Sequence, residues 1–249
     1  MVALKRFLSP LETRKDSGEF TMTISKLCAD HLRSIHASDY GQKIKASHAR
    51  EIVAAFFGYK SHAAQIAETD FPLSKIEEAA VMVPDVDRIA WRIARLSDLP
   101  TNLPSAYELA RILSDFLVDE DWFGGELWLY ESVENYVTEV YLIEHEYRLL
   151  DELSGVMAET NAFFDEAYFD EVSVDRNDEG MTITATGTFS GSSDPDKMFA
   201  GDTIDMSAMI TLDRVAGHIC FHEPDLSAGG EINDDWYDPG DEPQRPAAE

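Results

Sequence analysis

The fold is decided by the run Met181-Thr182-Ile183-Thr184-Ala185-Thr186-Gly187-Thr188-Phe189, in which apolar or small side chains alternate with threonine. A period of two is typical of a β-strand that buries one face. Residues 169–174, just before this run, alternate in the same way. We therefore expect a hairpin across residues 175–180, with Gly180 at a positive φ in the turn.

Alternating stretches follow the hairpin as well. Residues 203–215 alternate between apolar and polar side chains, and residues 218–222 and 231–232 give two shorter strands. The sequence therefore predicts an antiparallel sheet of four or five strands, with threonine and aspartate on its solvent face.

The chain before residue 160 has mostly helical periodicity. We expect helices within residues 21–37, 47–58, 61–67, 71–99, 104–117 and 133–150. The last of these carries one apolar face and many acidic side chains. The predicted fold class is α+β, with an N-terminal helical region followed by acidic helices packed on the sheet.

The proline-rich residues 100–104 are the best candidate linker in the chain. We expect a helical region over 1–100, an acidic α+β domain over 101–237, and a disordered acidic tail over 238–249. The helical region contains an αα-hairpin at 46–68 with the outline of a helix-turn-helix. Gly58 suits the left-handed position that ends its first helix.

Charge changes abruptly at the same linker. Residues 1–100 hold 14 basic and 13 acidic side chains, whereas residues 101–249 hold 6 basic and 35 acidic ones, a net charge of −29. If residues 101–249 form a compact body, it is roughly 38 Å across. Its net charge then amounts to about 0.8 negative charge per Å of diameter, against roughly 0.6 per Å of helix axis for duplex DNA. This charge argues against direct binding of residues 101–249 to a nucleic-acid backbone. Two explanations remain open: solubility or a salt-adapted proteome, and steering toward a basic partner.

Aromatic side chains lie beside these acids, as in the centres of many protein interfaces. Burial of the same rings in the core is the alternative interpretation. The candidate partner-binding residues are Asp119, Glu120, Asp121, Trp122, Glu126, Trp128, Glu131, Asp234, Asp235, Trp236, Tyr237 and Asp238.

The helix-turn-helix outline supports a second interpretation, because it is the one basic neighbourhood of the chain. In a DNA-binding regulator it would contact DNA, and the acidic half would serve as a dimerisation or effector module. Plain helix packing is the simpler explanation of the same pattern. The candidate DNA-binding residues are Lys45, His48, Arg50, Lys60, His62 and Gln65.

A resemblance enters at this hairpin. Ser47-His48 followed by Gly58-Tyr59-Lys60-Ser61-His62-Ala63 resembles a short element in uncharacterised proteins of bacterial plasmids and integrative elements. In charge and size the chain is also similar to anti-CRISPR and anti-restriction inhibitors. The resemblance implies a small acidic counter-defence protein of a mobile element.

Enzymatic and metal-binding motifs find little support in the sequence. We see no nucleophile elbow and no phosphate-binding glycine loop, so we expect no enzyme activity and no cofactor. Residues 175–180 imitate the start of a calcium loop, but its twelfth position is Thr186 instead of a glutamate. His218 and His222 share a strand face about 13 Å apart, too far to hold one ion.

Location is inferred from two further features. The chain lacks a signal-peptide pattern and an apolar run of membrane-spanning length. Its two cysteines, Cys28 and Cys220, are expected to be free buried thiols in a reducing cytoplasm. We therefore expect a cytoplasmic, non-enzymatic protein that occupies the basic nucleic-acid-binding surface of a partner protein or ribonucleoprotein complex, without contacting nucleic acid or a membrane itself.

Overall fold

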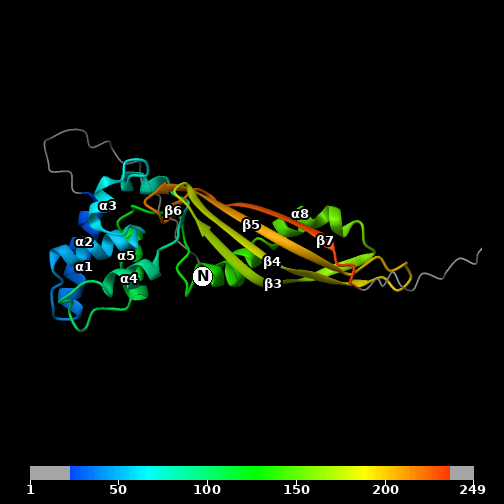
Figure 1. Cartoon of the computed structure of the whole chain (residues 1–249), viewed down its shortest axis with the longest axis horizontal. Coiled ribbons are helices and arrows are strands. Elements are labelled where there is room, and N and C mark those ends of the chain that lie inside the picture. The colour runs from blue at the N-terminus through cyan, green and yellow to red at the C-terminus, as the bar shows by residue number, and fades with distance from the viewer. Residues whose placement is uncertain (1–22, 236–249) are drawn as a thin grey trace, which may run out of the picture.

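The computed structural model describes residues 23–235, and these residues form an elongated molecule with a helical head at one end and a long sheet at the other (Figure 1). We call the helical end the head. The sheet end, together with the helices that cover one of its faces, is the blade. The predicted α+β class is confirmed.

The head consists of five α-helices and one 3₁₀ turn. Two of its helices begin at capping side chains: Ser61 accepts a hydrogen bond from Ala64 N, and Ser105 and Glu108 form a reciprocal capping box. The elements are α1 (Ile24–Asp39), α2 (Ala46–Phe56), α3 (His62–Ala67), η1 (Leu73–Glu78), α4 (Val86–Ile93) and α5 (Ala106–Asp119).

One hydrophobic core holds the head together and includes residues from both ends of the sequence. Ile52 and Phe56 of α2 and Leu113 of α5 are fully buried in it, and so are Ala216 and Cys220 from the C-terminal part of the chain. Helix α5 follows the predicted linker at 100–104 yet packs in this core. The head therefore extends past the predicted linker to the end of α5.

The blade is built on four long antiparallel strands in the order β3-β4-β5-β7. The predicted hairpin is confirmed and is longer than expected, since β3 (Ala162–Arg176) pairs with β4 (Gly180–Ser193) along its length. Strands β5 (Thr203–Ala216) and β7 (Asp225–Ile232) continue the sheet. Strand β7 is much longer than the predicted 231–232.

The number and kind of strands were predicted wrongly, because the whole sheet has seven strands and is mixed. Strand β1 (Val81–Met82) lies where a helix was expected and pairs in parallel with β2 (Glu126–Leu127). It pairs on its other side with β6 (Cys220–Phe221). The apolar run at 81–83 is buried between the two ends of the molecule, and β-branched residues bounded by Pro84 favour a buried strand there.

Helices cover one face of the blade, as predicted, but they are not continuous. Between residues 133 and 157 the chain forms a short helix, a π-helical turn and two further helices, with a break at His145. Their apolar side chains, such as Tyr141 and Leu149, pack on Ile183 and Ile210 of the sheet. The elements are α6 (Val133–Tyr136), η2 (Val137–Tyr141), α7 (Leu142–Glu144) and α8 (Glu146–Met157).

The β3–β4 turn differs from the prediction in one detail. Gly180 has no positive φ. Instead the side chain of Asn177 shapes the turn, since its Oδ1 accepts hydrogen bonds from the N–H groups of Glu179 and Gly180 at 2.8 and 2.9 Å. Gly180 is needed for a close approach, because a Cβ there would lie 2.2 Å from the carbonyl oxygen of Leu212.

Both cysteines are buried and free, as predicted. Among the helices within residues 23–235, none combines the length and the apolar character needed to cross a bilayer.

Head and blade meet closely at Gly58, which ends α2 with a φ of +84° as the sequence predicts. A Cβ at this position would lie 2.6 Å from Cβ of His218, which follows β5. The glycine therefore allows both the left-handed turn and the contact between the two ends of the molecule.

We expect Gly58→Ala to lower the free energy of unfolding by about 2 kcal/mol or more, because it adds a clash to the cost of a left-handed alanine. Urea denaturation followed by circular dichroism measures the loss. Gly41→Ala is the matched control, since Gly41 has a φ of +68° and open space around its Cβ position. Equal losses in the two variants would contradict a tight contact at His218.

Candidate functional site

Within residues 23–235, no helix or loop covers the face of the blade opposite its helices. Paired residues of neighbouring strands share a face, so the register places side chains of the four strands in cross-strand rows. None of the residues in four such rows is buried. The rows are Asp175–Thr182–Thr211–Asp225, Ser173–Thr184–Met209–Ser227, Glu171–Thr186–Ser207–Gly229 and Tyr168–Thr188–Asp205–Glu231.

These sixteen positions, which we call the open face, have a simple chemistry. Five carry carboxylates and eight carry serine or threonine hydroxyls, and none carries a lysine or an arginine. Threonines fill the β4 column in the middle, and all but one of the acids, Asp205, lie on the two outer strands. The predicted threonine and aspartate on the solvent face are thus present as an ordered array.

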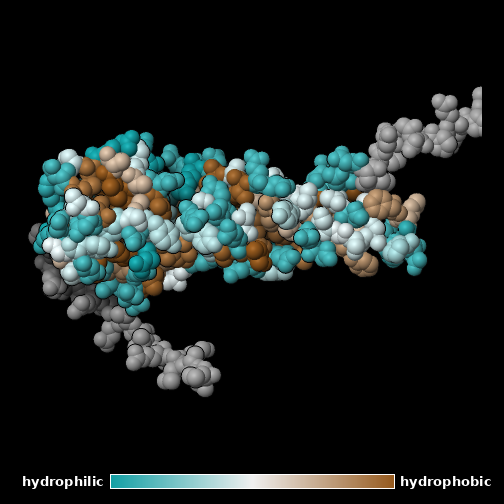
Figure 2. Space-filling view, turned by 90° about the horizontal axis from the view of Figure 1, so that it is seen from below, coloured by the Kyte–Doolittle hydropathy of each residue, from teal (hydrophilic) through white to brown (hydrophobic). Residues whose placement is uncertain are grey.

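Negative charge is concentrated in the blade. Residues 23–119 hold 11 basic and 13 acidic side chains, whereas residues 120–235 hold 4 basic and 28 acidic ones, a net charge of −24. The helical side of the blade also carries exposed acids, including Glu139, Glu146 and Asp151. Figure 2 shows the hydrophilic residues spread along the blade as well as over the head. By the counts above, negative charge increases along the long axis of the molecule, from the head to the blade.

The predicted partner-binding residues of the chain's middle lie near the head and do not form one aromatic patch. Asp119, Glu120 and Asp121 are exposed at the end of α5, but Trp122 packs partly into the head core. Trp128 is only 2% exposed and stacks on Tyr136 in the blade core, so its assignment as a surface anchor was wrong. Burial of a side chain as large as an indole stabilises the fold more than exposure of the ring beside acidic residues would.

Two further members of that set keep surface positions. Glu126 accepts a hydrogen bond from the hydroxyl of Tyr136, and Glu131 is one of the residues that line a pocket. Asp234 and Asp235 are exposed but follow β7 at the far end of the blade. Because β5 runs between the two ends at about 3.4 Å per residue, they lie roughly 40 Å from the head. Trp236, Tyr237 and Asp238 fall outside the described residues.

The candidate DNA-binding residues are also dispersed. Gln65 is buried and accepts a hydrogen bond from Ser25, so it cannot reach a base edge. Lys45 is exposed and pairs with Asp98. Lys60 and His62 line two different pockets. Of the other two, Arg50 is exposed and His48 is half-buried on α2. Helix α3 has only 6 residues, which leaves little surface for a groove.

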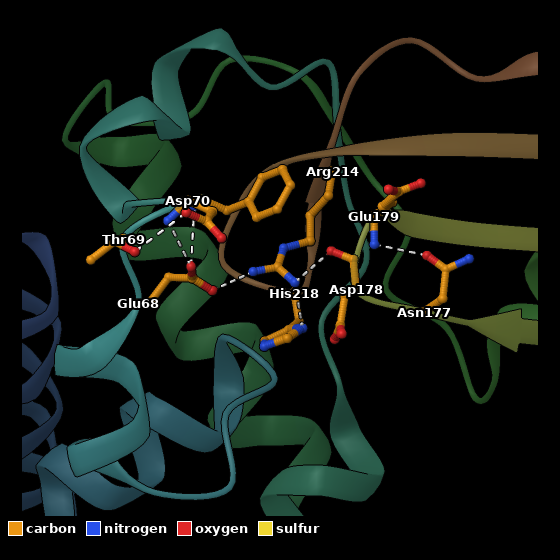
Figure 3. A network of polar contacts seen from close by, with 9 residues as sticks. Glu68, Thr69, Asp70, Asn177, Asp178, Glu179, Arg214 and His218 are labelled. Carbon is orange, nitrogen blue, oxygen red and sulfur yellow. Dashed lines mark hydrogen bonds and ion pairs between the residues drawn. The ribbon is translucent and has the colours of Figure 1, made fainter.

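The junction of head and blade is built around Arg214, which the sequence interpretation missed (Figure 3). This arginine is 7% exposed. Its Nη2 forms an ion pair with Glu68, and its Nη1 donates to the carbonyl oxygen of Asp178 at 3.0 Å and to Nδ1 of His218 at 3.1 Å. The guanidinium also lies 4.0 Å from the ring centroid of Phe71. One side chain thus joins three loops.

A β-bulge places Arg214 at this junction. Up to Asp213, β5 pairs with β4, and from Arg214 onward it pairs with β6, with a register shift between Arg214 and Ala216. The sequence contains a signal for this role. Arg214 continues the inward-facing phase of Ile210 and Leu212, so an arginine occupies a position where the pattern calls for an apolar residue.

Burial and charge shift the pKa values of this cluster. Desolvation acts to raise the pKa of Glu68, but hydrogen bonds from the N–H groups of Asp70 and Phe71, together with Arg214, lower it below its usual value. Desolvation and then Arg214 lower the pKa of His218. Because His218 Nδ1 accepts from Arg214, its proton is assigned to Nε2 and the ring is neutral.

Neither a metal centre nor a relative guides the assignment of function. Within residues 23–235 no three His, Cys, Asp or Glu side chains come together in a way that could hold a metal ion. Comparisons with family models, with curated proteins and with solved structures find no match to this chain. The function is therefore inferred from the open face and the charge of the blade.

We expect Arg214→Met and Glu68→Gln each to lower the free energy of unfolding by about 3 kcal/mol, because each leaves one member of a largely buried pair without its partner. The double variant should lose much less than the sum of the two. Urea denaturation of the four proteins measures this coupling.

The exposed pair Arg111 and Asp115 on α5 provides the control cycle, with Arg111→Met and Asp115→Asn. Its coupling should stay below about 1 kcal/mol. Additive losses at Arg214 and Glu68 would contradict a direct interaction between them.

Acid should weaken the wild-type protein partly through His218. Its folded pKa lies below the ordinary value of 6.5, so the unfolded chain takes up the proton first. The stabilising contribution of neutral His218 is complete above about pH 6.5 and is lost as the pH falls toward the folded pKa.

We expect His218→Asn, which keeps an acceptor for Arg214 but does not titrate, to lose less stability than the wild type between pH 7.5 and pH 5.5. Thermal unfolding across this range measures the difference. His222→Asn serves as the control because His222 is exposed. Identical pH profiles of His218→Asn and the wild type would contradict the depressed pKa.

Proposed function

We propose that the protein binds, through the open face of the blade, a cationic protein surface of the kind that otherwise holds nucleic acid. It acts as a non-enzymatic competitor that displaces DNA or RNA from a basic partner or ribonucleoprotein complex. The observation that carries this proposal is an uncovered face of carboxylates and hydroxyls, free of basic side chains, on a blade whose net charge is −24.

The linear charge density of the blade supports a nucleic-acid mimic. Strand β5 has 14 residues, and at about 3.4 Å per residue it spans roughly 45 Å. The net charge of residues 120–235 then amounts to about 0.5 negative charge per Å of blade, close to the roughly 0.6 per Å of duplex DNA. A surface evolved to bind phosphates would meet a similar field along the blade.

The open face also offers the right groups at short range. Carboxylates at its edges accept charge-assisted hydrogen bonds from arginine and lysine. The central hydroxyls accept and donate hydrogen bonds, and they leave the face flat enough for a partner to approach closely. Tyr168 and Met209 are 64% and 46% exposed there and add apolar contact area.

The head adds little to the attraction of a basic partner, but its low charge makes the electrostatic field of the molecule uneven. Residues 23–119 carry a net charge of −2, so the field of the molecule increases toward the blade. A basic partner is therefore steered to the blade, and this steering weakens as salt screens it over about 8 Å at physiological strength. Displacement of nucleic acid in this way is the activity of a counter-defence inhibitor of a mobile element, such as an anti-CRISPR protein.

The test measures displacement of a labelled DNA duplex from a lysine-rich histone by fluorescence anisotropy. The wild-type protein should release the duplex, and the concentration needed should rise steeply with salt. Glu171→Gln, Asp175→Asn and Glu231→Gln, combined in one variant, remove three charges from the open face. We expect this triple variant to need about 10-fold more protein, since each lost contact weakens binding modestly.

The control removes the same number of charges from the helical side with Asp151→Asn, Glu152→Gln and Glu159→Gln, all at exposed positions. It should change the required concentration less than about 2-fold. Equal effects of the two triples would indicate a response to net charge alone and would contradict a role of the open face. Failure of the wild type to release the duplex at low salt would contradict the function itself.

A further inference from the structure

A second site of opposite character lies in the junction of head and blade. A pocket of about 430 Å³ opens beside Arg214. Its walls come from four separate segments: the α2–α3 turn, the start of α4, the β3–β4 turn, and the region around β6. We call it the seam pocket.

The seam pocket gathers positive charge in a protein that has little of it. Lys60, Arg88, Arg176 and Arg214 line it, against the two carboxylates of Asp85 and Asp178. Two of these cations are among only 4 basic residues within 120–235, a segment with 28 acids. A cationic pocket therefore lies directly against the most anionic part of the chain.

Two arginine donors at this pocket have no hydrogen-bond acceptor among the described residues. Nε of Arg214 is buried and makes no hydrogen bond, although both of its Nη atoms do. Nε of Arg88 lies 3.7 Å from Asp85, which is an ion pair but longer than a hydrogen bond. Buried donors without acceptors are costly, so these two guanidinium groups are not fully satisfied by the chain itself.

We propose that the seam pocket binds a small anion of the phosphate class, either inorganic phosphate or a phosphomonoester. Arginine guanidinium groups suit tetrahedral oxyanions, because they present paired N–H donors in a planar fork. The neutral His218 ring contributes its Nε2 proton as a further donor. The exposed side chains of Lys60 and Arg176 lie in the walls and supply the outer contacts.

Binding at this place joins the two ends of the molecule. Lys60 and Arg88 belong to the head, whereas Arg176 and Arg214 belong to the blade. An anion held by both sets adds a contact across the junction beyond the Glu68–Arg214 pair. The ligand therefore stabilises the folded chain and fixes the orientation of the blade. This site differs from the open face, which attracts cations.

The experiment measures thermal unfolding of the full chain with 10 mM sodium phosphate, with adenosine monophosphate, and with acetate, at constant ionic strength. We expect phosphate to raise Tm by about 2–4 °C. Isothermal titration calorimetry with inorganic phosphate gives the affinity directly. A higher affinity for adenosine monophosphate identifies a phosphomonoester as the ligand, and binding of phosphate alone identifies the free ion. An equal rise with acetate would overturn the phosphate class.

Lys60→Gln, Arg88→Gln and Arg176→Gln, combined in one variant, test the site without touching Arg214. We expect a phosphate affinity at least 10-fold weaker. The matched control is Lys43→Gln, Arg50→Gln and Lys75→Gln, three exposed positions elsewhere on the head, which should leave the affinity unchanged. The proposal is overturned if phosphate does not bind the wild type at 50 mM, or if both triples weaken binding equally. Displacement of DNA from the histone is measured separately, so failure of one site does not imply failure of the other.

Discussion

The arrangement of this molecule depends on one buried guanidinium. Arg214 pairs with Glu68 of the head and also holds the β3–β4 turn and the loop that carries His218. An arginine that is 7% exposed would be strongly destabilising without these partners. Because the guanidinium must keep its ion pair and its hydrogen bonds, the three loops that provide its partners are held against each other. Head and blade therefore keep one relative orientation, although each has a hydrophobic core of its own.

The blade shows how a strongly charged chain can still fold. Its covered face buries Ile183, Ile210 and Leu212 under the helices, and this burial offsets the mutual repulsion of the acids. Many of the carboxylates lie on the open face, on the outer side of the helices and in turns, where water and salt screen them. A protein with this design keeps a large negative field on a rigid sheet. Two of the four basic residues within 120–235, Arg176 and Arg214, line the seam pocket and not the open face.

Much of the fold could be predicted from local pattern. The alternation in residues 181–189 predicted β4, and the glycine at 58 predicted the end of α2. Both signals depend only on residues that are neighbours in the sequence. Strand β1 was missed because two residues, Val81 and Met82, are too short to show any period. The strand exists only because β2 and β6 flank it. The indole of Trp128 was misplaced for a related reason: an aromatic beside acids has the same local pattern whether it is buried or exposed.

The sequence by itself determined the fold class, the polarisation of charge and the hydroxyl-rich face, since these follow from composition and from a period of two along one strand. Only the tertiary structure decided which acids share a face, because strand register joins residues that are far apart in the chain. It also decided that Lys60, Arg88, Arg176 and Arg214 meet at one pocket. No local pattern encodes this meeting, which results from packing the head against the end of the sheet. The buried arginine at the bulge makes that packing specific.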